Sequence, residues 1–162
     1  LGHSERRHVF GESDDWVNRK VKAVLDGGLK PILCIGETLG QREAGQTDLV
    51  LESQLELGLK DVAELEHCVI AYEPVWAIGT GVTAENEQVK LAHQAVRRIL
   101  VELYPGSDDI QVLYGGSVNP GNAEELISVP GVNGFLIGGA SLDIDSFTSI
   151  TQTVDNIQER IL

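Results

Sequence analysis

Four short apolar runs, separated by longer amphipathic segments, constrain the fold of this 162-residue chain more than any other feature. Each run is apolar at nearly every position, which is typical of strands buried on both faces of a parallel sheet. The runs are residues 31–35, 68–72, 110–114 and 133–137. We expect four strands there.

Apolar residues at helical spacing lie between and around these predicted strands. The first stripe starts at Val17, with Ser13 as the expected N-cap and Gly27–Gly28 at its end. The expected cap of the third stripe is Thr83, and Asn119–Pro120 is expected to open a short helix. The stripes are Val17, Val21, Val24 and Leu25; Leu51, Leu55 and Leu59; Val89, Ala92, Val96, Ile99, Leu100 and Leu103; Leu126 and Ile127; and Phe147, Ile150, Val154, Ile157 and Ile161.

The alternation of helix and strand predicts βαβ units around a parallel sheet. A doubly wound sheet and part of a (β/α)8 barrel both satisfy this order. We see no internal repeat or linker, so the chain is expected to be one domain, or most of half of a larger one. It opens at Leu1 and contains no methionine. We therefore expect a piece of a longer protein.

Composition excludes several classes of function. Twelve Lys and Arg against 25 Asp and Glu give a net charge of −13, which argues against nucleic-acid binding and a basic membrane-surface protein. The apolar runs are far shorter than the roughly 18 residues of a membrane span. Cys34 and Cys68 stand far apart in apolar runs, so we expect two buried thiols and neither a disulfide nor a metal site. An anionic small molecule remains a possible ligand.

Polar and glycine residues follow three of the predicted strands, at the end where parallel α/β folds bind ligands. Glu73 follows the second strand, Gly115, Gly116 and Ser117 follow the third, and Gly138 and Gly139 follow the fourth. Glycine lets the backbone approach a ligand and present its N–H groups, so the two loops together predict a phosphate site. For either pair alone, a tight turn is the favoured interpretation.

Two further side chains have a functional and a structural interpretation. Glu73 emerges from a buried strand, where burial raises a carboxyl pKa toward that of a general base. A salt-bridged structural acid fits the same position. His3 lies in the polar segment Gly2-His-Ser-Glu-Arg-Arg7, where a solvated histidine is the plainer alternative.

Several blocks together resemble the triosephosphate isomerase family, in the order in which that family carries them. They are residues 1–7 (LGHSERR), 34–37 (CIGE), 71–81 (AYEPVWAIGTG), 114–118 (YGGSV) and 138–142 (GGASL). The resemblance implies a (β/α)8 TIM barrel, of which residues 1–162 are the C-terminal part, about strands five to eight with their helices. It implies interconversion of dihydroxyacetone phosphate and glyceraldehyde 3-phosphate, with no metal or organic cofactor.

The resemblance also assigns roles to single residues. Glu73 matches the base that moves the proton, His3 the neutral electrophile, and Glu5 an acid that supports the geometry. Cys34 matches a buried cysteine near the site. The phosphate-binding positions are Gly79, Ser117, Gly138 and Gly139, and the mobile lid is Pro74, Val75, Trp76, Ala77, Ile78, Gly79 and Thr80. Excluding water under the lid protects the enediolate from phosphate loss.

The resemblance leaves part of the family's pattern unmatched. The family's Asn-x-Lys motif on the first strand, and the long loop that builds most of its dimer interface, have no counterpart in residues 1–162. The resemblance implies a cytoplasmic homodimer for the complete protein. Because the lysine and part of the barrel wall are missing, we expect very low activity for this chain alone. A half-barrel that binds phosphate or self-assembles without catalysis is the main alternative, and another phosphate-binding barrel enzyme is a weaker one.

Overall fold

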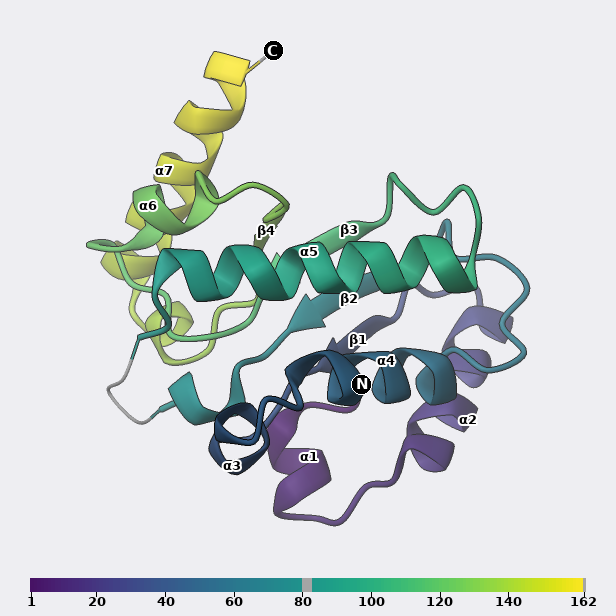
Figure 1. The fold of residues 1–162 in the computed structure, drawn as a ribbon. Coiled ribbons are helices and arrows are strands. Elements are labelled where there is room, and N and C mark those ends of the chain that lie inside the picture. Colours follow the sequence, from purple (N-terminus) through teal and green to yellow (C-terminus); the bar gives the residue numbers. More distant parts are fainter. Residues whose placement is uncertain (80–82, 162) are drawn as a thin grey trace.

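A single parallel sheet forms the centre of the computed structural model, which describes residues 1–79 and 83–161 (Figure 1). Its strands lie in the order β1-β2-β3-β4, the order of the chain. This confirms the predicted α/β class. The described strands do not reverse their order, as the strands of a doubly wound sheet do at its switch point. The strands are β1 (Ile32–Ile35), β2 (Val69–Tyr72), β3 (Gln111–Tyr114) and β4 (Gly134–Phe135).

The register brings the ends of three strands level with one another. Ile35 pairs with Tyr72, and Tyr72 pairs with Tyr114. The segments that follow β1, β2 and β3 therefore leave the sheet at one common edge. Leu1 continues the pairing on the other side of β1, where its ammonium donates to the Ile32 carbonyl at 2.7 Å and its carbonyl accepts from the Cys34 N–H at 2.8 Å.

The longer helices lie beside one another in chain order, as the contacts of α2 with α4, α4 with α5 and α6 with α7 show. In Figure 1, α5 crosses in front of the sheet and the end of α7 extends past the rest of the chain. The helices are α1 (Ser4–His8), α2 (Asp14–Asp26), α3 (Leu39–Glu43), α4 (Thr47–Gly58), α5 (Asn86–Leu103), α6 (Ala123–Ile127) and α7 (Ile144–Ile161), with 3-10 turns η1 (Val75–Ala77) and η2 (Gly139–Leu142).

The core lies between the sheet and these helices. Leu33, Ile70 and Val112 on the strands are at most 1% exposed, as are Leu55 on α4 and Val96 on α5. The predicted stripes of α4 and α5 thus face the sheet, since packing an apolar helix face against it is what stabilises such a helix. Leu103 and Phe147, each at one end of a predicted stripe, are exposed instead. None of the described helices combines the length and the apolar character that a membrane span needs.

Two predicted helix starts were wrong, and one was confirmed. Ser13 caps α2 and accepts from the Trp16 N–H at 3.4 Å. The N-cap of α5 is Glu85 rather than Thr83, and the Glu85 N–H donates to the Gln88 side chain at 2.9 Å. The helix therefore begins where the Gln88 side chain, in the first turn, can accept a hydrogen bond from the N-cap residue.

The short helix after β3 also begins later than expected. Asn119 and Pro120 belong to a turn, in which the Asn119 side chain accepts from the Gly121 N–H at 2.8 Å. The N-cap of α6 is Asn122. Asparagine satisfies local backbone groups in turns as readily as at helix starts, so the pair fits both patterns.

Candidate active site

A cavity of about 430 Å³ opens at the carboxyl ends of the strands. Its walls come from the start of α1 and from the segments that follow β2, β3 and β4. Six of the predicted catalytic and phosphate-binding residues line it: His3, Glu73, Gly79, Ser117, Gly138 and Gly139. The positions of polar residues after parallel strands therefore identified residues that the fold brings together.

Glu73 is the buried acid of this cavity, with its side chain only 3% exposed. Its Oε1 lies 3.1 Å from His3 Nε2, and its Oε2 accepts from the Ser4 N–H at 2.9 Å. Burial raises the pKa of the Glu73 carboxyl, while His3, the Ser4 N–H, the Leu1 ammonium and Arg7 oppose that rise. A carboxylate with a raised pKa, facing a cavity, has the character of a general base.

The position of His3 follows from its place at the start of α1. It is the N-cap, and its Nδ1 accepts from the Glu5 N–H at 3.3 Å. A ring nitrogen that accepts a hydrogen bond carries no proton. The proton of the neutral ring is therefore on Nε2, which faces Glu73.

Glu5 does not bring its carboxylate to the cavity. Its side chain is exposed on α1, and Glu5 is absent from the described residues that line the cavity. Its backbone N–H makes the contact with His3. Glu5 thus contacts His3 through its backbone N–H. The predicted role of its carboxylate in supporting the catalytic geometry stays a prediction.

Glycines let the backbone pack closely around Glu73. A Cβ on Gly36 would lie 1.7 Å from the Glu73 carbonyl oxygen, and a Cβ on Gly115 would lie 2.9 Å from Glu73 Cγ. Any larger residue would displace the base. By contrast, a Cβ on Gly138 or Gly139 would meet nothing within 4 Å, so steric crowding does not explain those two glycines.

The lid segment, defined here as residues 74–80, begins directly after Glu73. Pro74 and Ala77 are buried, and the Ala77 carbonyl accepts from the Ser117 hydroxyl at 2.7 Å. Ile78 and Gly79 reach the cavity wall. Thr80, the last residue of the predicted lid, lies outside the described residues.

A cluster around Glu37 holds the start of the lid segment, and of its members sequence reasoning singled out only Trp76. The Glu37 carboxylate is fully buried and accepts from the Tyr72 hydroxyl, from Trp76 Nε1 at 3.1 Å and from Arg42 Nη1 at 3.2 Å. The Arg42 guanidinium also lies 4.7 Å from the centre of the Trp76 ring. Glu37 follows β1 closely, just as Glu73 follows β2, and that parallel was the available signal.

The two cysteines are buried and free. Burial, and then the nearby Glu73 carboxylate, raise the pKa of Cys34 to about 12. A thiol that stays protonated is a poor nucleophile, which fits the predicted structural role of Cys34. Among the described residues, no group of three or more His, Cys, Asp and Glu side chains is placed to hold a metal ion.

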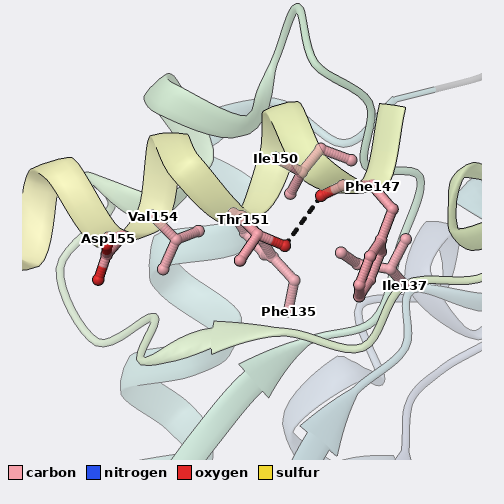
Figure 2. A pocket seen from close by; sticks show the side chains of 7 residues that line it. All are labelled: Phe135, Ile137, Phe147, Ile150, Thr151, Val154 and Asp155. Atoms are coloured by element: carbon pink, nitrogen blue, oxygen red, sulfur yellow. Dashed lines mark hydrogen bonds between the residues drawn. The ribbon is translucent and has the colours of Figure 1, made fainter. Parts of the chain in front are cut away.

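A second, apolar groove of about 630 Å³ runs along α7 beside β4 (Figure 2). Figure 2 shows its lining side chains, which are Phe135, Ile137, Phe147, Ile150, Thr151, Val154 and Asp155. Only one of these is charged, and the groove contains none of the predicted site residues. The smaller cavity around Glu73 is therefore the candidate active site.

Comparison with known proteins agrees with this arrangement. The triosephosphate isomerase family model matches residues 1–154. The triosephosphate isomerase of Geobacter metallireducens is 52% identical over 154 residues, 93% of this chain and 61% of its own length. Those of Chlorobium phaeobacteroides (51% over 152 residues, 93% and 61%) and Syntrophotalea carbinolica (50% over 156 residues, 94% and 62%) are similarly close. The chain spans about three fifths of the length of these curated relatives, and it belongs to the triosephosphate isomerase family.

Proposed function

We propose that the protein, in its complete form, interconverts dihydroxyacetone phosphate and glyceraldehyde 3-phosphate by proton transfer. The observation that carries the proposal is the pairing of His3 and Glu73 in one cavity, with a ring N–H facing a buried carboxylate at 3.1 Å. The named relatives are triosephosphate isomerases. Because the chain belongs to the same family, this is the reaction that we assign to His3 and Glu73.

The geometry suggests a role for each group. The Glu73 carboxylate would take a proton from the carbon beside the substrate carbonyl and return it to the neighbouring carbon. His3 Nε2–H would donate its proton to the carbonyl oxygen as negative charge develops there, and the ring would recover a proton from the hydroxyl on the neighbouring carbon. Both groups now face each other, so a substrate must enter between them and take over the contacts that His3 and the Ser4 N–H make with Glu73.

The phosphate group would occupy the part of the cavity bounded by Gly79, Ser117, Gly138 and Gly139. Gly138 and Gly139 are exposed with open space beside them, so backbone N–H groups there are accessible to an anion. The Ser117 hydroxyl now donates to the Ala77 carbonyl. Its use for phosphate would thus be coupled to a change at the lid segment.

We infer further that the complete protein is a cytoplasmic homodimer that binds neither nucleic acid nor membrane. The net charge of −13 on these 162 residues argues against nucleic-acid and membrane binding. Val9 and Phe10, just after α1, and Trp16 on α2 are between 60% and 73% exposed, and such apolar side chains suit a protein partner. Light scattering on the complete protein would give its mass in solution.

The experiment that tests the proposed reaction is Glu73→Asp in the complete protein. Withdrawing the carboxylate by one methylene leaves the phosphate contacts in place. Turnover should therefore fall by roughly a hundredfold or more, as expected for loss of a general base, while affinity for a non-reacting triose phosphate analogue barely changes.

Serine 13 is a convenient control site, because Ser13→Ala affects only the cap of α2 and should leave turnover unchanged. Unfolding of Glu73→Asp, seen as a loss of the cooperative urea transition, would favour the structural interpretation of Glu73. For the chain of 162 residues alone we expect very low turnover, since no Lys or Arg lines the described part of the cavity. Near-normal turnover from that chain would contradict this.

A further inference from the structure

Arg7 connects the segment that carries His3 to the rest of the fold. Its side chain is 8% exposed. Its Nε donates to the Gly2 carbonyl at 2.7 Å, Nη2 donates to the Cys34 carbonyl at 3.3 Å, and Nη1 pairs with Asp14 Oδ1 at 2.5 Å. One guanidinium therefore joins the residue before His3, the strand β1 and the first turn of α2.

The local backbone explains why this anchor is needed. α1 has only five residues, and a helix of that length is not stable by itself. Gly2 has a φ of +69°, and a Cβ there would lie 2.9 Å from Arg7 Nη2, so the chain bends tightly over the guanidinium. Movement of this bend would move both His3 and the Ser4 N–H, and both of these groups contact the Glu73 carboxylate.

Arg7 also belongs to the charges that act on Glu73. Burial raises the pKa of Glu73, and the groups that lower it are His3, the Ser4 N–H, the Leu1 ammonium and Arg7. Asp14, paired with Arg7, offsets part of that positive charge. Arg7 and Asp14 are therefore a cation and its anionic partner, with opposite expected effects on the pKa of Glu73.

We propose that Arg7 is a positioning residue of the candidate active site, which holds the segment of His3 and Ser4 against β1 and places a buried cation near Glu73. A role of Arg7 in catalysis rests on the proposed isomerase function. The effect of Arg7 and Asp14 on the ionisation of Glu73 can be measured without an assay of turnover.

The test is a pH titration of the Glu73 carboxyl by carbon-13 NMR on the complete protein, with the signal assigned through Glu73→Gln. Arg7→Met should raise the pKa of Glu73, because a nearby cation favours the charged carboxylate and the variant removes that cation. Asp14→Asn should lower the pKa of Glu73, because Arg7 then keeps its charge without its partner.

Two more variants sharpen the result. Arg7→Lys keeps the positive charge but loses the planar guanidinium with its three hydrogen bonds. The pKa of Glu73 should therefore change less than in Arg7→Met. Arg19→Met removes an exposed arginine of α2 that pairs with Asp15, and it should leave the pKa of Glu73 unchanged. If Arg7→Met does not fold, Arg7→Lys and Asp14→Asn still decide the matter.

Loosening of the structure alone would move the pKa of Glu73 in the same direction in Arg7→Met and Asp14→Asn. That result, or an unchanged pKa in Arg7→Met, would overturn the proposal. Opposite shifts support it. Failure of the complete protein to isomerise triose phosphates would refute the proposed function and leave this titration interpretable.

Discussion

The glycines near the carboxyl ends of the strands are of two kinds. Some offer a backbone N–H to a ligand, and others leave room for a neighbouring strand. Gly79 belongs to the first kind under the proposed function. It reaches the cavity wall with a φ of +65°, and a Cβ there would meet nothing within 4 Å. The space around it therefore does not demand glycine, and its amide is the group that a phosphate would use.

Gly79→Pro should weaken binding of inorganic phosphate by roughly tenfold or more. Proline removes the N–H, and a hydrogen bond to a charged group is worth about 1.5–3 kcal/mol. Proline also cannot adopt a positive φ. Gly79→Ala separates the two effects, since alanine keeps the N–H at a conformational cost of about 1–2 kcal/mol. Calorimetric titration with phosphate would compare the three proteins, and equal affinity in the proline variant would remove Gly79 from the phosphate site.

Gly36 shows the second kind of constraint. A Cβ there would lie 1.7 Å from the Glu73 carbonyl oxygen, a distance that forces β1 and β2 apart at their carboxyl ends. Gly36→Ala should therefore lower the free energy of unfolding by about 3 kcal/mol, the upper part of the range for overpacked cores. Urea denaturation measures this directly.

Gly40, on α3, is the matched control. A Cβ there would meet nothing within 4 Å, and alanine favours a helix over glycine by about 1 kcal/mol. Gly40→Ala should thus be neutral or stabilising. Equal stability of the two alanine variants would show that the loop after β1 moves aside freely.

At the scale of secondary structure, how much could be predicted depended on the length of the element. The strand runs and the long stripes of α2, α4, α5 and α7 were found because their burial repeats over many residues. The short elements α1, α3, η1 and η2 were missed, since a few hydrogen bonds from caps and turns decide them. The five-residue α6 was predicted from Leu126 and Ile127, with a start that was too early. The Glu37 cluster was missed for a related reason: it joins side chains from β2, α3 and η1, and one sequence does not show such convergence.

The packing of α5 on β2 and β3 encloses a histidine that no prediction included. His93 is fully buried, its ring lies 5.8 Å from that of Tyr72 and 6.4 Å from that of Tyr114, and its Nδ1 is 3.1 Å from the Gly131 carbonyl. Burial lowers the pKa of His93 to about 4. The unfolded chain binds this proton below about pH 6.5, and the folded chain binds it only near pH 4.

Stability should therefore fall as the pH drops from about 6.5 to 4, by about 3 kcal/mol from His93 alone. The raised pKa of Glu73 acts in the opposite direction, so the difference between wild type and His93→Gln isolates the effect. Urea denaturation across this range should show a shallower loss of stability in His93→Gln. His67→Gln, at an exposed position, should behave like wild type. Parallel curves for wild type and His93→Gln would mean that His93 is protonated in the folded chain.

At the scale of the whole molecule, the described sheet has an unpaired edge at β4. In the described part of the chain, β4 pairs only with β3, and the apolar groove of about 630 Å³ runs beside it along α7. Leu142, Ile144 and Phe147 are 90%, 83% and 45% exposed. An exposed apolar groove next to an unpaired strand edge favours association, whereas the net charge of −13 opposes it at low salt.

We therefore expect the 162-residue chain to be weakly stable and to self-associate at about 0.15 M salt, where repulsion between its acidic surfaces is screened beyond roughly 8 Å. Sedimentation equilibrium should give masses above 17.5 kDa that rise with concentration. Phe147→Asp, in the groove, should shift the mass toward 17.5 kDa, while Leu49→Asp on α4, 65% exposed and outside the groove, should not. A wild-type chain that stays monomeric at every concentration would show that the groove is no site of association. Equal effects of the two variants would show that an added negative charge anywhere on the surface reduces the association.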